Sequence, residues 1–219
     1  RGTQTSALSF GGFDGTRTAL TESWNGTNWT EVNDLNTGRS DLGGAATDNT
    51  SALAFTGKNP AANPPSGMLN LTESWNGTSW TEVNDTNTQK EGVVGIGTQT
   101  AALSVGGSSP IGAGTLGENE SWNGTSWAEV GDLNTARFTM GGSGTQPSAL
   151  VFGGGPGNLT QTEEWNGTSW TEVSDLSSGR DQLGGTGTSA SALAFGGFTT
   201  TQIAATEEWS LNDTSFTVG

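Results

Sequence analysis

The sequence contains no cysteine, no histidine and no tyrosine. These absences exclude disulfide bridges, metal sites built on thiolate or imidazole, and nucleophiles that depend on a histidine base. A chain without cysteine suits an oxidising or a reducing compartment equally, so this absence does not locate the protein. We expect no catalytic residue, no metal site and no cofactor.

Basic residues are scarce as well. Lys and Arg number 7 against 22 Asp and Glu, for a formal net charge of −15. A field of this sign repels nucleic-acid phosphates and anionic lipid headgroups. Apolar runs are short and broken by Gly, Ser and Thr, far below the roughly 20 residues that span a bilayer. We therefore expect neither nucleic acid nor a membrane as partner.

What the sequence does contain is one unit repeated along the chain, marked by a W-N-G-T-x-W turn. The first tryptophans lie 43 to 51 residues apart, about the length of a four-stranded propeller blade. We predict an all-β, five-bladed β-propeller of four-stranded antiparallel blades, forming one domain over residues 1–219. The predicted blades are about 1–35, 36–86, 87–133, 134–176 and 177–219. The tryptophans of the repeat are Trp24, Trp29, Trp75, Trp80, Trp122, Trp127, Trp165, Trp170 and Trp209.

Each unit divides into a glycine-rich innermost strand, an A-L-x-F strand, a strand that leads into W-N-G, and a T-x-W-T-E-V strand. Asn-Gly between two strands predicts a type I′ hairpin turn, in which both central residues have positive φ. The tryptophans on either side of the turn share one face of the hairpin. Each tryptophan can bury about 150–250 Å², so we predict that they form the core between blades rather than a sugar-stacking surface.

Three features of the unit carry a resemblance to a known family. A basic residue precedes the innermost strand, a Gly-Gly pair such as Gly11-Gly12 closes the second strand, and paired tryptophans bracket the outer hairpin. The unit resembles the kelch repeats of galactose-oxidase-like β-propellers, and this resemblance implies propeller blades. Regular W-N-G-T-x-W repeats are also similar to those of bacteriophage structural proteins, which would imply a virion or another extracellular surface.

The repeated bases are the first candidate site. Each follows an aspartate by five residues, which suggests ion pairs that hold one blade to the next. The alternative is an electropositive collar that binds carboxylates or anionic glycans. The bases are Arg39, Lys90, Arg137 and Arg180, and the aspartates are Asp34, Asp85, Asp132 and Asp175.

Repeated glutamates on the two outer strands suggest a paired-carboxylate hydrolase, but they recur in every unit, and we interpret them as solvated rim residues. They are Glu22 with Glu31, Glu73 with Glu82, Glu120 with Glu129, and Glu164 with Glu172.

Repetition fails in the loops between the second and third strands, which differ in length and content. A constant frame with varied loops on one face is how scaffolds carry binding sites. We predict a non-enzymatic binding or structural module that engages a glycan or a protein through this face. A glycan-cleaving hydrolase with axial carboxylates is the alternative.

The chain opens at Arg1 without an apolar signal stretch, which suggests a trimmed or excised fragment. Its first three residues align with only the tail of an innermost strand, so we expect the first blade to contain little of its own innermost strand. Missing upstream residues, a truncated blade or a strand from another chain would each account for this. We expect a monomer, with strand exchange between chains as the alternative.

Overall fold

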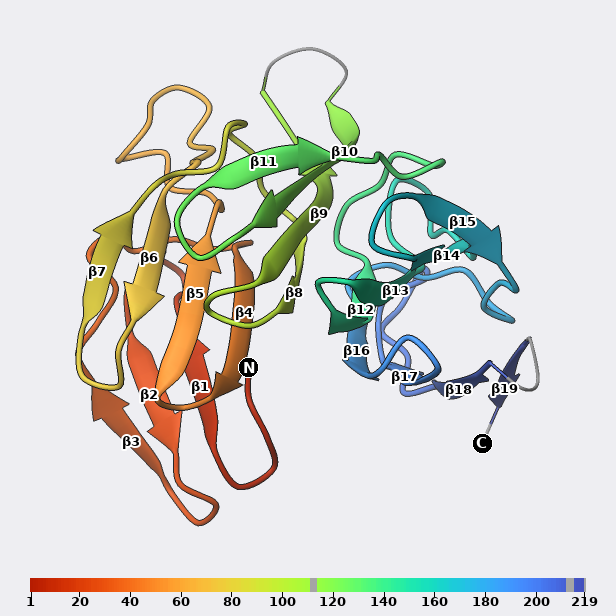
Figure 1. Ribbon diagram of the computed structural model, residues 1–219, viewed down its shortest axis with the longest axis horizontal. Helices are drawn as coiled ribbons and strands as arrows, with labels where there is room; N and C mark the ends of the chain where they lie inside the picture. The colour runs from red at the N-terminus through yellow and green to blue at the C-terminus, as the bar shows by residue number, and fades with distance from the viewer. Residues whose placement is uncertain (111–113, 212–214, 219) are drawn as a thin grey trace.

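Five antiparallel sheets follow one another along the chain and are arranged around a common axis (Figure 1). The computed structural model describes residues 1–110, 114–211 and 215–218. The first sheet has three strands and each of the other sheets has four, so the prediction of a five-bladed, all-β propeller is confirmed. The described part of the chain contains no helix long and apolar enough to cross a membrane.

The strands of each blade are hydrogen-bonded in chain order. From the axis outward we letter them a to d in blades 2 to 5, and b to d in the three-stranded blade 1. Blade 1 contains β1 (Ala7–Phe10), β2 (Thr21–Trp24) and β3 (Trp29–Val32). Blade 2 contains β4 (Gly43–Asp48), β5 (Ser51–Phe55), β6 (Thr72–Trp75) and β7 (Trp80–Val83). Blade 3 contains β8 (Val94–Gly97), β9 (Ala102–Ser108), β10 (Thr115–Trp122) and β11 (Trp127–Val130). Blade 4 contains β12 (Gly141–Thr145), β13 (Ser148–Phe152), β14 (Thr162–Trp165) and β15 (Trp170–Val173). Blade 5 contains β16 (Gly184–Gly187), β17 (Ser191–Phe195), β18 (Thr206–Ser210) and β19 (Ser215–Val218).

Glycine fills strand a because neighbouring blades touch there, backbone to backbone. A Cβ on Gly185 of β16 would lie 2.6 Å from the backbone nitrogen of Gly142 in β12. A Cβ on Gly95 of β8 would collide in the same way with the backbone of Gly44 in β4. No side chain fits at either position, so the small inner strands let the blades converge.

The outer hairpins differ from the predicted type I′ turn. Trp24 pairs with Trp29 across a four-residue loop, in which Gly26 has a φ of 90°. Asn25 is not among the residues of positive φ; its Oδ1 instead accepts the N–H groups of Thr27 and Asn28, each at 2.9 Å. The prediction was wrong because the asparagine stabilises the turn with its side chain rather than with a left-handed backbone. Blades 2, 3 and 4 repeat this arrangement at Asn76, Asn123 and Asn166.

The tryptophans pack each blade onto the one before it. In blade 2 the rings of Trp75 and Trp80 lie 5.4 Å apart, and Trp80 meets Phe10 of blade 1 edge-on at 5.0 Å. The indole nitrogen of Trp80 donates to Oγ1 of Thr21 in blade 1 at 3.0 Å. Blades 3 and 2 repeat both contacts, and the tryptophans of blades 2 to 4 are buried. These contacts make the tryptophans the core of the inter-blade interfaces.

The ring of blades is open between blade 5 and blade 1 (Figure 1). Extensive strand contacts join blades 1 to 2, 2 to 3, 3 to 4 and 4 to 5, and no contact of that extent joins the described strands of blades 5 and 1. Trp29 of blade 1 is 48% exposed, and Phe195 of blade 5 is 44% exposed. Near the axis, Arg1 and Leu8 exchange backbone hydrogen bonds, so Arg1 and Gly2 lie where strand a would be in blade 1.

Candidate functional site

The repeated bases are fully buried in the structure, and each one pairs with a glutamate of strand c. The Arg39 guanidinium lies 3.2 Å from Oε1 of Glu73, and Arg137 lies 2.8 Å from Glu163. The other pairs are Lys90 with Glu120 at 3.1 Å and Arg180 with Glu207 at 2.9 Å. Burial lowers the pKa of Arg39 and Arg137 from the ordinary arginine value, and the paired glutamates oppose this. We call each pair a base–glutamate latch.

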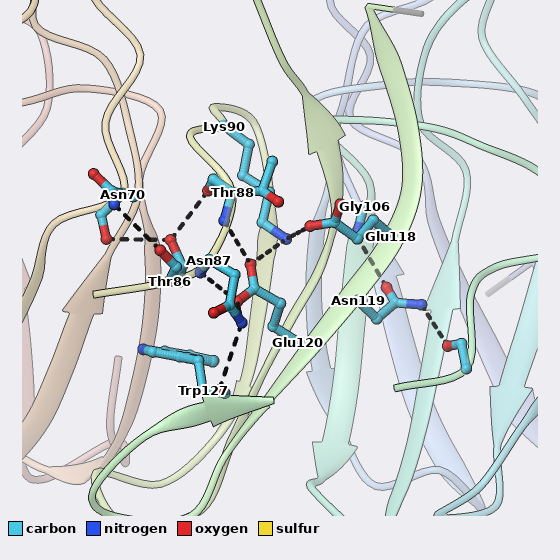
Figure 2. A network of polar contacts seen from close by, with 11 residues as sticks. Asn70, Thr86, Asn87, Thr88, Lys90, Gly106, Glu118, Asn119, Glu120 and Trp127 are labelled. Carbon is cyan, nitrogen blue, oxygen red and sulfur yellow. Dashed lines mark hydrogen bonds and ion pairs between the residues drawn. The ribbon is translucent and has the colours of Figure 1, made fainter. Parts of the chain in front are cut away.

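Each latch also ties down the loop that leads into its blade. The carboxylate of Glu73 accepts the backbone N–H of Asn36 at 2.7 Å and its side-chain amide at 2.8 Å. In blade 3, Glu120 accepts the same pair of bonds from Asn87, while Lys90 lies between Glu120 and Glu118 (Figure 2). A buried charge held in this way is costly to leave unpaired. The latches therefore fix each d–a connection, which joins two consecutive blades, onto strand c of the blade that follows it.

The predicted aspartate pairing was wrong. Oδ1 of Asp34 accepts the backbone N–H of Thr21 at 3.0 Å, and Asp85 does the same for Thr72 at 2.9 Å. Asp175 caps Thr162 at 3.2 Å in blade 4. These three aspartates thus fix the start of strand c in blades 1, 2 and 4. The bases prefer the glutamates because those carboxylates lie inside the interface beside them.

The interpretation of the glutamates as solvated rim residues was also wrong for Glu73 and Glu120 of strand c, whereas Glu22 of blade 1 is exposed. Glu73 and Glu120 are buried, and in blade 4 the inward residue is Glu163 rather than Glu164. Their cross-strand neighbours on strand d, such as Glu172, are exposed. Since the latch residues are buried and already paired, we assign the ligand to other residues.

The basic residues outside the latches are Arg1, Arg17 and Lys58. Arg17 and Lys58 belong to the b–c loops of blades 1 and 2, and both line a pocket of about 340 Å³. This loop-face pocket lies where the b–c loops meet the d–a connections, which are hydrogen-bonded together, as in the bond from Arg39 N–H to the carbonyl of Thr18 at 3.1 Å. Its lining is Arg17, Asp41, Lys58, Glu91, Gly92, Ser108, Phe138 and Thr139.

A backbone ladder runs through the lining of this pocket from blade to blade. Gly92 N–H donates to the carbonyl of Asp41 at 2.8 Å, and Thr139 N–H donates to that of Gly92 at 2.7 Å. Gln182 continues the ladder onto Thr139 at 2.8 Å. Asp41, Thr139 and Gln182 hold positive φ values of 54°, 49° and 51°. Such strain costs about 1–3 kcal/mol per residue and clusters at ligand sites.

Two basic side chains line the pocket, and only Lys58 is paired with a carboxylate of the described residues. Lys58 Nζ is paired with Glu91 at 2.9 Å, and both side chains are partly exposed. Arg17 forms none of the ion pairs of the described residues, and its buried Nε has no hydrogen-bond partner. Its guanidinium lies 5.4 Å from the centre of the Phe13 ring. The buried Oγ1 of Thr139 is also unsatisfied. The pocket therefore offers unused hydrogen-bonding groups.

The axial cavity has a different character. It encloses about 170 Å³ and is lined mainly by glycine backbone, with Arg1, Ser143 and Thr186 as its polar side chains. Among the described residues that line it there is no Asp or Glu. The axial carboxylates required by the hydrolase alternative are therefore not part of this lining.

Sequence reasoning pointed to the varied loops but did not single out Arg17 or Lys58. The available signal was that both are bases outside the repeat in a chain that has only 7 bases. The sequence matches no protein-family model, and no curated protein matches it at a significant level. The class that the structure defines is therefore a five-bladed β-propeller with an open ring.

Proposed function

We propose that this protein is a non-enzymatic binding module that engages a glycan at the loop-face pocket. The observation that carries the proposal is Arg17, which lines a polar pocket and forms none of the ion pairs of the described residues. Structural arginines of this chain have carboxylate partners, as Arg39 has Glu73. A base without one is suited to a carboxylate brought by a ligand.

The rest of the lining suits a sugar. Asp41 and Glu91 can accept hydroxyl hydrogens, Lys58 can donate, and Ser108 can do both. Phe138 adds an apolar surface. A volume of about 340 Å³ lies at the lower end of the usual range for ligand pockets, which suits one or two sugar units. We therefore propose an acidic sugar, with its carboxylate on Arg17.

The proposal extends to the origin and location of the protein. Bases before strand a, Gly-Gly pairs after strand b and paired tryptophans support a kelch-like relationship. Glycan binding by an acidic, repetitive propeller fits a virus particle or a cell surface. Both remain parts of the proposal, together with a protein ligand as a possible outcome of its test.

The test is a glycan-binding screen with the intact chain, followed by titration of the acidic glycan that binds best. Arg17→Ala should weaken binding at least tenfold, and Arg17→Lys should weaken it less because the charge remains. Glu129→Gln, an exposed change on strand d, is the control and should leave binding intact. Unchanged binding by Arg17→Ala contradicts the assignment of the site. Release of free sugar would favour the hydrolase alternative.

A further inference from the structure

The open ring leaves an unpartnered face on each terminal blade. We call the side of blade 1 that faces away from blade 2, with Ser9, Trp24 and Trp29, the leading face. We call the side of blade 5 that faces away from blade 4, with Leu193, Phe195 and Thr206, the trailing face. Their large side chains are exposed, with values of 48% for Trp29, 40% for Leu193 and 44% for Phe195. The matching residues of blade 2, Phe55 and Trp80, are 0% and 5% exposed because a neighbouring blade covers them.

These two faces are the two halves of the interface that already joins consecutive blades. Between blades 1 and 2 and between blades 2 and 3, the phenylalanine that ends strand b meets the second tryptophan of the next blade, as Phe55 meets Trp127 at 4.9 Å. The threonine opposite that phenylalanine accepts the tryptophan N–H, as Thr72 does from Trp127 at 3.1 Å. Phe195 lies opposite Thr206 in the same register on the trailing face.

The leading face carries the matching half. Trp24 and Trp29 are paired across their hairpin, as Trp75 and Trp80 are, with ring centres 5.5 Å apart. Trp29 therefore presents a ring that can pack on Phe195 and an N–H that Thr206 can accept. The complementarity is between different faces, so a contact between them runs head to tail.

The turn between strands a and b supplies a second point of contact. Ser148, at the start of strand b in blade 4, lies 2.6 Å from Ser189 in the a–b turn of blade 5, measured between hydroxyl oxygens. Ser191 begins strand b in blade 5. Gln4 corresponds to Ser189, because each carbonyl accepts the N–H of the first tryptophan of its own blade, Trp24 and Trp209. Ser191 and Gln4 are thus the equivalent pair.

We infer that a second copy of this chain covers each face, with the trailing face of one copy packed on the leading face of the next. The occupant is identified by continuity with the internal inter-blade interface, whose two halves are exposed on the same molecule. Trp29 and Phe195 are both exposed in the single copy, so the two faces do not cover each other and the contact forms between copies. Each copy carries a formal charge of −15, so added salt should strengthen the association by screening repulsion.

The first experiment blocks one face at a time and follows mass by sedimentation. Trp29→Glu blocks the leading face and Phe195→Glu blocks the trailing face, and each variant alone should be monomeric. An equal mixture should form a dimer, because one intact face of each kind remains. Phe13→Glu, at a 64% exposed residue of a b–c loop, adds the same charge elsewhere and should associate like the unmodified chain.

Two results would overturn the inference: an unmodified chain that stays monomeric at high concentration, or a mixture of the blocked variants that stays monomeric. Persistent self-association of either blocked variant would also overturn it, because that result indicates contact between like faces.

The second experiment uses the absence of cysteine from the chain. Gln4→Cys and Ser191→Cys, prepared separately and mixed under mild oxidation, should give a disulfide-linked dimer. Ser148→Cys/Ser189→Cys in one chain is the positive control, since those two hydroxyls already touch. The inference is contradicted if the positive control forms its disulfide and the mixture of the two variants does not. Putting Gln4→Cys and Ser191→Cys into one chain tests closure within a copy: a crosslinked monomer as the sole product contradicts it too.

Discussion

Replacing Glu163 with glutamine should remove the central charge of one latch while keeping its shape. Glu163 accepts Arg137 Nη2 at 2.8 Å, the N–H of Asn134 at 2.7 Å and the amide of Asn134 at 2.8 Å. Arg137 is fully buried, so the substitution leaves its charge without a partner carboxylate. Breaking such a pair costs about 3–5 kcal/mol. That is a large part of the roughly 5–15 kcal/mol that stabilises a folded domain.

The assay is thermal and urea unfolding followed by circular dichroism. At about 2–4 °C per kcal/mol for a chain of this size, Glu163→Gln should lower Tm by about 6–20 °C. Glu172→Gln is the matched control, because Glu172 lies directly opposite Glu163 on strand d and is exposed. Arg137→Met combined with Glu163→Gln should cost less than the sum of the single changes, since no buried charge is left alone. The reasoning is refuted if Glu163→Gln and Glu172→Gln lower stability equally.

Two further substitutions test the packing between blades by the same unfolding assays. Gly95→Ala should lower the free energy of unfolding by several kcal/mol, on the order of a severe overpacking change, because the added Cβ would collide with the backbone of Gly44. A variant as stable as the wild type would contradict this close approach of the two strands. Trp80→Phe should cost at least about 1 kcal/mol, since the indole bond to Thr21 and part of the ring contact are lost. Trp29→Phe, at an exposed position, should lower the free energy of unfolding less. Equal losses of stability at Trp80 and Trp29 would contradict the role of the inter-blade contact.

The period of the tryptophans was sufficient to predict the fold, because a repeat of this length with an Asn-Gly hairpin fits few architectures. The same repeat did not predict the type of the hairpin turn. A type I′ turn and an asparagine-capped loop both place Asn before Gly, and the difference lies in whether the φ of Asn25 is positive. Sequence composition does not encode that choice on its own.

The latch partners were missed for a different reason. Arg39 lies five residues after Asp34 in the sequence, but its carboxylate partner Glu73 lies on strand c of the next sheet. Glu163 lies two residues before Trp165, as Glu73 lies two before Trp75, so the repeat itself separates Glu163 from its neighbour Glu164; the base that pairs with it is not marked in this way. Long-range pairing therefore required the structure.

The pocket was missed in part because it is assembled from segments that do not repeat. Arg17 and Lys58 come from b–c loops of different length, and they meet only after the blades are placed. The ladder beside them has glycine only at Gly92, while Asp41 and Thr139 hold positive φ at the same position of their blades without being glycine. The unequal b–c loops in the sequence indicated which face of the propeller binds, but the residues that line the pocket could be named only from the packing of the blades.

The most direct test of glycan binding at the loop-face pocket is an NMR titration of the intact chain with the acidic glycan selected by the screen. The Arg17 Nε–H and the backbone amides of Lys58 and Thr139 should shift together and saturate. The indole N–H signal of Trp29, on the leading face, should stay in place. Saturating shifts at Trp29 with an unmoved Arg17 Nε–H would contradict the account.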